Sequence, residues 1–342
     1  MEQYVGLDVS QKTTAICVVD GSGARVWQGE CRSDPETMAL IVRSRAPAAV
    51  KVAFESGPLA VWHWHRLREL GLPIVCIHAR HARAALEAQV NKTDANDAHG
   101  LAQLVRSGWF RAVEVKSVES YRLRALLTTR SQLVAIRTRL YNQVRGLLKT
   151  FGIVLPAGKG GSFERLVERH VPADGCIELA IGGLMRIWRE VTAELDQLNR
   201  RLQEIAKKEE ICRRLMSIPG LGPTTALAFV TAIDDPPRFK HSKDVGAYLG
   251  LTPRRYQSGE IDRVGHVSKC GDRLTRSLLF EAAGVLLYRS KCPTALRPWG
   301  LALSRRAGYD KARIALARKL AVLMHRMWTN GTSFATQPAC AA

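Results

Sequence analysis

The stretch "YVGLDVSQKTTAICVVDGSG", residues 4–23, decides the fold of the N-terminal part of the chain. Two apolar, β-branched runs, 4–9 and 13–19, are followed by the turn sequence "DGSG" and a third such run at 24–31. This pattern predicts a hairpin followed by a third strand. Asp8 is the exception within it, because burying a carboxylate in an apolar strand costs several kcal/mol unless a cation or hydrogen-bond donors meet it. We therefore expect Asp8 to have a functional partner.

The elements that follow the hairpin indicate how the sheet continues. We expect helices at 35–45, 59–70 and 79–88, strands at 50–55 ("VKVAFE") and 73–77 ("PIVCI"), and a last helix that starts around "KTDANDAHGLAQLVRSG". Hairpin strands followed by crossover strands imply a mixed sheet flanked by helices, in the order of an RNase H fold. Sugar kinases and actin-like ATPases also begin with a strand acid, but they need glycine and hydroxyl residues after it to hold phosphates. No glycine occurs between Asp8 and Asp20, which disfavours the kinase alternative.

Four acidic residues come together in this expected fold. Glu55 ends the strand 50–55, at the carboxyl edge where ligands of open α/β sheets collect. Asp94 and Asp97 are three apart at the start of a helix and share one face, although both also suit helix capping. A shared explanation for Asp8, Glu55, Asp94 and Asp97 is a pair of divalent ions about 4 Å apart that clamp a phosphodiester. Carboxylate oxygens favour Mg²⁺ or Mn²⁺ over zinc.

Composition indicates a nucleic-acid partner. The 342 residues suit roughly two domains. Lys and Arg outnumber Asp and Glu by 51 to 31, a net charge of +20, and nucleic acid is the commonest polyanion for such a protein. We expect no signal peptide, no membrane span and a cytoplasmic location, nucleoid-associated when DNA is bound. The eight cysteines include no CxxC pair, so we expect them to be reduced and expect no structural zinc.

The middle of the chain, 113–210, has the pattern of paired helices. Leucines recur every seven positions in the basic stretch 119–150, at Leu126, Leu133, Leu140 and Leu147. A second helix alternates spacings of four and three, at Leu184, Trp188, Val191, Leu195, Leu198, Leu202 and Ile205. This predicts an antiparallel or intermolecular coiled coil and hence a homodimer or homotetramer; the alternative is two ordinary packed helices. The basic residues of the first helix predict binding to RNA or DNA backbone, at Arg130, Arg137 and Arg145.

The C-terminal region, 211–328, is expected to be mostly helical and to bind phosphates. "SIPGLGPTTALAFV" resembles a helix-hairpin-helix motif in which Gly220 and Gly222 expose backbone N–H groups, although a tight helix connection is the alternative. Further basic residues interleaved with glycines favour phosphate binding, namely Arg254, Arg255, Arg263, Lys269 and Arg273. Ser258 lies on a predicted turn among them, and most such serines only form the turn. Residues 329–342 are expected to be a disordered tail.

Five motifs in order resemble one family over nearly the whole chain. "GLDVSQKTT", "FESG", "KTDANDA", "SIPGLGPTTA" and "GLTPRRYQSGEIDRVGHVSKCGD" are similar to motifs of the DEDD transposases of the insertion-sequence-110 family, which are Piv-like, bridge-RNA-guided recombinases. The resemblance implies that Asp8, Glu55, Asp94 and Asp97 are the four catalytic acids. It also implies that Ser258 is the catalytic serine.

The resemblance further implies an organisation and a chemistry. It implies a RuvC-like domain at 1–112, a coiled coil at 113–210 used in oligomerisation, and a C-terminal transposase domain at 211–328 that carries the serine. Members cut and rejoin DNA through a covalent phosphoserine link directed by a noncoding bridge RNA. Two alternatives stay open: a metal-dependent endonuclease similar to Holliday-junction resolvases, for which Ser258 would be dispensable, and a noncatalytic nucleic-acid scaffold, for which the acids would be dispensable.

Overall fold

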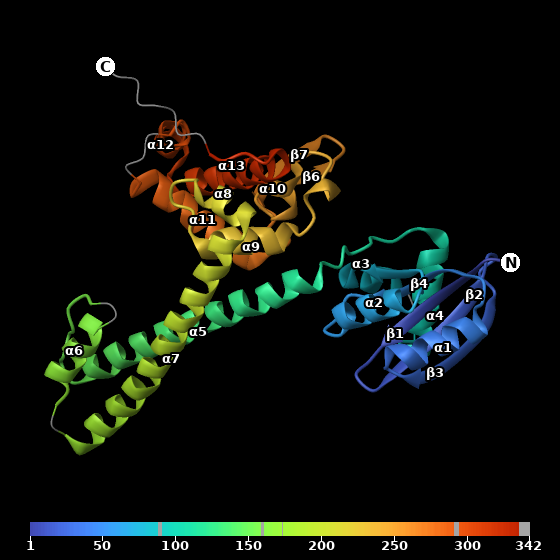
Figure 1. Ribbon diagram of the computed structural model, residues 1–342, viewed down its shortest axis with the longest axis horizontal. Helices are drawn as coiled ribbons and strands as arrows, with labels where there is room; N and C mark the ends of the chain where they lie inside the picture. The colour runs from blue at the N-terminus through green and yellow to red at the C-terminus, as the bar shows by residue number, and fades with distance from the viewer. Residues whose placement is uncertain (88–90, 159–160, 173, 291–293, 335–342) are drawn as a thin grey trace. The chain divides into compact units, whose positions relative to one another are not determined.

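The protein is described here by a computed structural model that covers residues 1–87, 91–158, 161–172, 174–290 and 294–334 (Figure 1). The chain divides into two compact units, Met1–Lys116 and Ser117–Ala342. The predicted division of the second unit near residue 210 stays a prediction.

A five-stranded mixed sheet forms the centre of the first unit. Its order is β3 (Arg25–Arg32), β2 (Thr13–Asp20), β1 (Gln3–Val9), β4 (Ala49–Glu55) and β5 (Ile74–Ile77). The first three strands pair antiparallel, whereas β1, β4 and β5 run parallel. This is the RNase H strand order that the hairpin and crossover pattern predict, because each parallel neighbour needs a helical connection.

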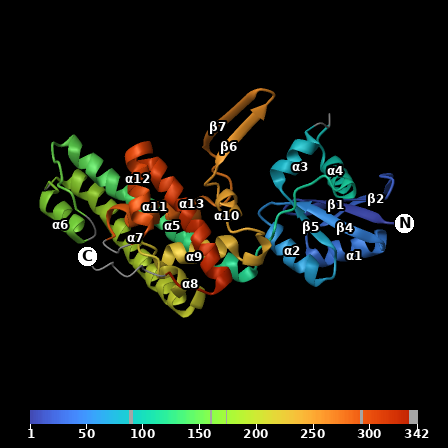
Figure 2. The same cartoon turned by 90° about the horizontal axis from the view of Figure 1, so that it is seen from above.

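Four helices cover the two faces of this sheet, and in Figure 2 α3 and α4 lie on one side and α1 and α2 on the other. Their bounds are α1 Pro35–Arg45, α2 Ala60–Glu69, α3 Ala79–Leu86 and α4 Asp94–Ser107. Helix α4 approaches β1 closely at Gly6, where a Cβ would lie 2.0 Å from the carbonyl oxygen of Ala98. The glycine therefore sets the distance between α4 and the strand that carries Asp8.

The second unit begins with a long helical hairpin made of α5 (Val118–Thr150) and α7 (Gly175–Lys208), with α6 (Gly161–His170) beside it. The helices pack antiparallel, since Val144 and Leu148 near the end of α5 share a core with Ile181 near the start of α7. The heptad leucines of α5 are only half-buried, and the fully buried positions include the neighbouring Leu127 and Leu148. The described hairpin is thus a pairing within one chain, and self-association stays a prediction.

The rest of the second unit is a helical core with one β-hairpin. Its elements are α8 (Glu210–Met216), α9 (Pro223–Ile233), the short 3-10 helix η1 (Pro236–Arg238), α10 (Asp244–Tyr248), β6 (Pro253–Ser258), β7 (Ile261–Val267), α11 (Arg273–Tyr288), α12 (Leu296–Ala307) and α13 (Tyr309–Asn330). Helix α9 is almost wholly buried, and its side chains share a core with α8, α11 and α13. The β6–β7 hairpin was not predicted, because its residues are nearly all exposed and lack the apolar alternation of a strand.

The C-terminal end of the described chain is packed. The predicted tail 329–342 starts within the last turn of α13, and the backbone N–H of Phe334 donates to Ser217 Oγ at 2.8 Å. Residues 335–342 lie outside the described residues. Within the described ranges, every helix is too short or too polar to cross a membrane.

Candidate active site

Asp8 and Glu55 stand together because of strand register. Strands β1 and β4 are parallel with Gly6 opposite Ala53 and Leu7 opposite Phe54, so the next residues along are Asp8 and Glu55. Side chains alternate along a strand, and Asp8 shares the face of Gly6, the residue against which α4 packs. The two carboxylates therefore point toward α4 at the carboxyl ends of both strands.

Asp94 and Asp97 lie in the first turn of α4, on that same face of the sheet. Thr93 is the N-cap of the helix, and its side chain accepts a hydrogen bond from the Asn96 N–H at 3.2 Å. The capping alternative for the two aspartates is thus disfavoured, since a threonine already caps the helix. Acidic residues in a first turn still gain a fraction of a kcal/mol from the helix dipole.

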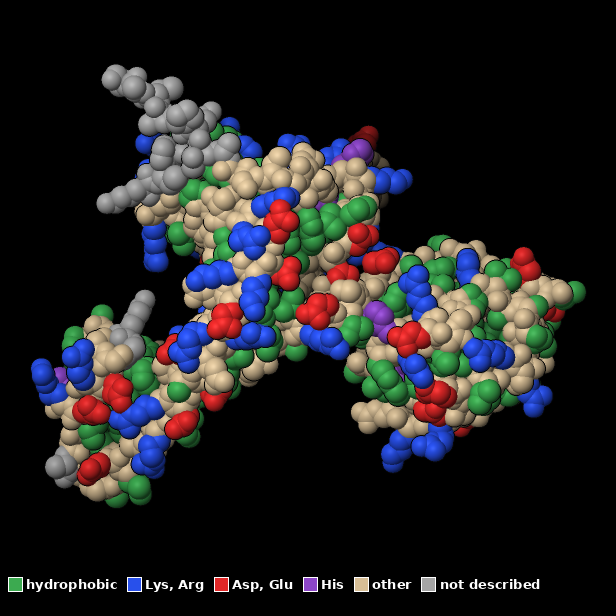
Figure 3. Space-filling model, viewed as in Figure 1, with side chains coloured by type: hydrophobic (Ala, Val, Ile, Leu, Met, Phe, Trp, Pro, Cys, Tyr) green, Lys and Arg blue, Asp and Glu red, His purple; other side chains and the backbone are tan. Residues whose placement is uncertain are grey.

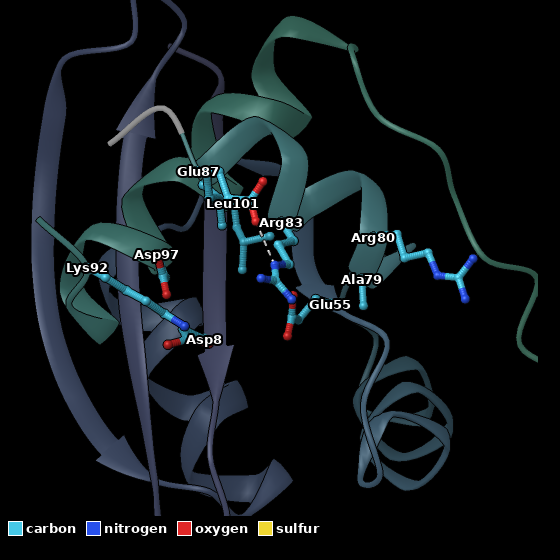
Figure 4. Close-up of a pocket in the computed structure, with 10 residues that line it drawn as sticks. Asp8, Glu55, Ala79, Arg80, Arg83, Glu87, Lys92, Asp97 and Leu101 are labelled. Carbon is cyan, nitrogen blue, oxygen red and sulfur yellow. Dashed lines mark hydrogen bonds and ion pairs between the residues drawn. The ribbon is translucent and has the colours of Figure 1, made fainter. Parts of the chain in front are cut away.

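These elements enclose a pocket of about 640 Å³. Asp8, Glu55 and Asp97 line it, whereas Asp94 is not part of its lining. Figure 4 shows Lys92 reaching over the pocket toward Asp8, and the side chains of α3 on the opposite side. The cations of the lining are Lys92, Arg80 and Arg83, of which Arg83 is paired with Glu87 at 2.8 Å.

The acids of the site act on one another electrostatically. Burial, and after it the charges of Asp94, Asp97 and Glu55, raise the pKa of Asp8 to about 6, although Lys92 opposes the shift. Desolvation in the pocket and the charge of Asp97 also raise the pKa of Glu55. Among the described residues, no hydrogen bond or ion pair is made by the carboxylate of Asp8. The arrangement thus concentrates negative charge that an added cation would neutralise.

The donor set suits a hard divalent cation, since its members are carboxylate oxygens. Within the described part of the chain, however, no three His, Cys, Asp or Glu side chains lie close enough together to form a ready coordination sphere. The acids converge on one pocket, and binding an ion requires their side chains to draw closer.

Ser258 lies at the tip of the exposed β6–β7 hairpin. It pairs with Ile261 across a two-residue turn in which Gly259 has a φ of +55°. Tyr256 pairs with Arg263 two residues away from Ser258, so both side chains share its face of the ribbon. The hydroxyl is therefore presented to solvent next to an exposed arginine and an exposed tyrosine.

The predicted phosphate-binding residues of this region divide into paired and unpaired side chains. Arg255 forms a bidentate ion pair with Asp262 across the hairpin, with hydrogen bonds of 2.9 and 2.5 Å. Arg254 donates to the carbonyl oxygen of Ser268 at 3.1 Å. Arg263, Lys269 and Arg273 are exposed, and none is in an ion pair within the described ranges. These three, together with Arg254, whose carbonyl partner is neutral, keep an uncompensated charge for a phosphate.

The basic residues of helix α5 also divide into paired and unpaired side chains. Figure 3 shows Lys and Arg side chains along the α5–α7 hairpin, with Asp and Glu side chains between them. Arg130 donates to Asn199 Oδ1 on α7 at 2.7 Å, and burial lowers its pKa. Arg145 donates to the carbonyl oxygens of Leu155 and Pro156. Arg130 therefore joins α5 to α7, and Arg145 holds the loop that follows α5, whereas Arg137 makes no hydrogen bond or ion pair among the described residues.

The turn "SIPGLGPTTA" connects α8 and α9 and is itself packed. Gly220 has a φ of +86°, and a Cβ there would lie 3.2 Å from Val285 Cγ1 of α11. Gly222 is the N-cap of α9 and has open space around it. The structure thus gives Gly220 a packing role, and phosphate binding at this helix-hairpin-helix-like turn stays a prediction.

The cations of the acidic pocket are the residues that sequence reasoning missed. Arg80 and Arg83 are three apart in "HARHARAAL", so they share a face of α3, and Lys92 comes two residues before Asp94. The signal in the sequence was their proximity to the acidic motif. The chain has 51 Lys and Arg residues, however, so closeness to the motif in sequence does not separate a pocket cation from any other basic residue.

An RNase H-like sheet with acids at the carboxyl ends of its parallel strands defines a class of proteins that act on nucleic-acid strands. Comparison with known proteins narrows this class. The profile of the "Transposase IS116/IS110/IS902 family" matches residues 212–299, and a transposase profile of the DEDD IS110 type matches residues 5–153. The transposase for insertion sequence element IS1111A of Coxiella burnetii is 30% identical over 344 residues, which cover 97% of this chain and 91% of that protein. The chain belongs to the IS116/IS110/IS902 family of transposases, and it is an enzyme of DNA transposition.

Two further similarities are shorter. The pilin gene-inverting protein of Moraxella bovis is 30% identical over 109 residues, 30% of this chain and 33% of that protein. Among solved structures, Thermus thermophilus RuvC in complex with a Holliday junction substrate matches 33% of this chain and 100% of its own, with 15% identity and a TM-score of 0.26. At that score the match adds nothing to the strand order, on which the fold assignment rests.

Proposed function

We propose that the protein cuts and rejoins DNA by transesterification, with Asp8, Glu55, Asp94 and Asp97 as the ligands of one or two Mg²⁺ or Mn²⁺ ions and Ser258 as the nucleophile. The observation that carries the proposal is that Asp8, Glu55 and Asp97 line one pocket, where burial and the charges of the neighbouring acids, Asp94 included, raise the pKa of Asp8 to about 6. Residues kept only for stability would not be arranged to repel one another.

When bound, a divalent ion supplies Lewis-acid stabilisation of charge on the phosphate and on the oxygens that enter and leave. The chain supplies the remaining parts. Arg80 on α3, next to the ion pair of Arg83 with Glu87, presents positive charge to a DNA phosphate at the mouth of the pocket, opposite the carboxylates. Lys92 limits the repulsion between Asp8 and Glu55 before DNA arrives.

Ser258 suits the role of nucleophile because it is presented at the tip of a ribbon with no competing bond recorded among the described residues. Attack by its Oγ on phosphorus forms a phosphoserine ester and breaks the bond to the leaving deoxyribose oxygen, which takes up a proton. The reverse step, with a different DNA end, restores the serine and joins the strands. Since one ester replaces another, no external energy source is needed. A structured noncoding bridge RNA would choose the two DNA sites, and a homodimer or homotetramer would bring four strands together.

A hydrolytic endonuclease is the second candidate, and one observation favours it. The acidic pocket and its cations all lie within the first unit, Met1–Lys116, so a water molecule could attack there without any residue of the second unit. This enzyme would leave unjoined ends and would not need Ser258.

The test is a search by mass spectrometry for a nucleotide attached to serine, after the full chain is incubated with Mg²⁺, the DNA that flanks its gene and RNA transcribed from that DNA. We expect an adduct on Ser258 and joined products in the unaltered protein. Ser258→Ala should lose both, whereas the control Ser277→Ala, at an exposed position of α11, should keep both. Cuts that persist without joining in Ser258→Ala would reject the serine and establish the endonuclease.

A further inference from the structure

A second large pocket lies in the other unit, Ser117–Ala342. It has a volume of about 790 Å³ and is bounded by the base of the β6–β7 hairpin, α12 and α13. Figure 1 shows these elements in the same unit, and residues at the base of the hairpin line the pocket together with α13. The volume lies within the range of about 300–1,000 Å³ that is usual for small-molecule and cofactor sites. We name it the Trp299 pocket, after its aromatic residue.

The floor of the Trp299 pocket is apolar. Ile314 and Val322 of α13 line it and are half-buried, and Trp299 of α12 lines it with 37% of its surface exposed. Apolar side chains around an exposed indole ring are suited to a flat, aromatic ligand group. Base–aromatic stacking is the usual way in which proteins hold an unpaired nucleobase.

The rim of the pocket is cationic. Lys311, Arg318, Lys319 and Arg326 all belong to α13, line the pocket and are exposed. Among the described residues none of the four is in an ion pair. The Lys319 ammonium lies over the Trp299 ring, 3.9 Å from its centre, so a base that stacks on this face displaces the ammonium toward the phosphates. No described residue of the lining is acidic. An apolar, aromatic floor with an uncompensated cationic rim is complementary to a base that is attached to phosphates.

We propose that the Trp299 pocket binds an unstacked nucleotide of a single-stranded nucleic-acid segment, with the base against Trp299 and its phosphates at the lysines and arginines of α13. The pocket includes Gly265 and His266 of β7, so an occupant also touches the base of the hairpin whose tip carries Ser258. The proposal does not depend on the acids or on the serine, because binding needs neither cleavage nor a metal.

Binding of fluorescent 12-nucleotide DNA and RNA strands of one sequence, and of the matching blunt DNA duplex, tests this with the full chain in EDTA. Trp299→Leu should weaken binding of at least one single strand about 5- to 150-fold, the effect of one lost stacked base, and leave the duplex almost unchanged. The strand that loses affinity identifies DNA or RNA as the source of the nucleotide. The control Trp62→Leu, at a 51% exposed tryptophan of the first unit, should change neither.

The charges have a separate signature. Lys311→Gln combined with Arg326→Gln should reduce the magnitude of the slope of log K against log salt by about 1.4 for single strands, because each lost phosphate contact accounts for about 0.7. Equal loss for single strands and duplex, no loss in Trp299→Leu, or displacement of the oligonucleotide by polyglutamate of equal charge would each overturn the proposal.

The unaltered protein provides a measurement that does not depend on folding of a variant. An oligonucleotide containing 4-thiouracil should crosslink to Trp299 or to residues beside it on α12 and α13 when irradiated. Crosslinks that map only to other surfaces would refute the pocket.

Discussion

Replacement of Asp8 by asparagine tests the acidic pocket through stability as well as activity. The pKa of Asp8 rises from its ordinary 3.8 to about 6, mainly through burial and the neighbouring carboxylates, so the folded state resists its negative charge. At about 1.36 kcal/mol per pKa unit this amounts to about 3 kcal/mol, which solvent screening of a half-buried group reduces to about 1–2 kcal/mol. Asp8→Asn keeps the shape and removes the charge. It should therefore be more stable than the unaltered protein by that amount in EDTA at pH 8.

The pH dependence follows from the direction of the shift. An acid whose pKa is raised on folding destabilises the folded state at every pH above the folded value. The penalty fades as the pH falls from about 6 toward 3.8, because folded Asp8 then takes up a proton that the unfolded chain does not. The advantage of Asp8→Asn should thus be largest near pH 8 and should shrink toward pH 4.

Chemical denaturation followed by hydrogen exchange at the amides of β1 and α4 measures this locally, so that unfolding of the second unit does not interfere. Saturating Mg²⁺ should make the unaltered protein more stable than Asp8→Asn. A ligand at about 100 times its dissociation constant adds about 2.7 kcal/mol to the free energy of unfolding of a protein that binds it. Recombination by Asp8→Asn should be lost throughout.

A matched control is Asp20→Asn in the neighbouring strand. Asp20 accepts hydrogen bonds from the backbone N–H groups of Ser22 and Ala24 at 2.9 and 3.0 Å, and hydrogen bonding lowers its pKa. The same chemical change should therefore destabilise the protein at this position. Two results would contradict the inference that the acids of the pocket repel one another until a cation binds. One is that Asp8→Asn is no more stable than the unaltered protein in EDTA, and the other is that Mg²⁺ stabilises both proteins equally.

Two further predictions concern packing and charge. Gly6→Ala should destabilise the first unit by about 3 kcal/mol or more, because the added Cβ would overlap the backbone of α4. The control Gly21→Ala, where a Cβ would have no atom within 4 Å, should change the thermal unfolding temperature little. Equal effects of the two substitutions would contradict the close packing of α4 on Gly6. Arg139 is exposed on α5, so Arg139→Gln should reduce the magnitude of the slope of log K against log salt for duplex DNA by about 0.9, as measured by fluorescence anisotropy. Arg145→Gln should mainly lower the free energy of unfolding, by about 1 kcal/mol, as measured by chemical denaturation. An unchanged slope in Arg139→Gln would exclude Arg139 from the DNA contact.

The sheet and its acids were accessible from the sequence because they follow from short-range rules. The apolar, β-branched runs 4–9 and 13–19 predict the hairpin, and the turn "DGSG" predicts the third strand. A residue that ends a parallel strand lies at the edge where such sites form. The order β3-β2-β1-β4-β5 confirms that reading of the fold. The grouping of Asp8 with Glu55 then follows from register alone.

Features set by tertiary pairing were not accessible. Arg255 appeared as a free phosphate ligand, yet its partner Asp262 lies across a hairpin whose exposed strands carry no apolar alternation. Arg145 belonged to a basic run, but the carbonyl groups it binds come from the loop after α5. The fully buried position Leu127 lies beside the heptad leucine Leu126, because helix packing in the hairpin, not periodicity alone, selects the seam.

The contact of α4 with Gly6 also bears on how copies of a mobile element decay. Every substitution of a glycine adds at least a Cβ, and at residue 6 that atom would strike the backbone of the helix that carries Asp94 and Asp97. A single codon change there would move two acids away from a third without altering any of them. Silenced copies of such a gene can therefore retain an intact set of acidic codons, and residue 6 should be inspected together with those codons before a copy is judged competent.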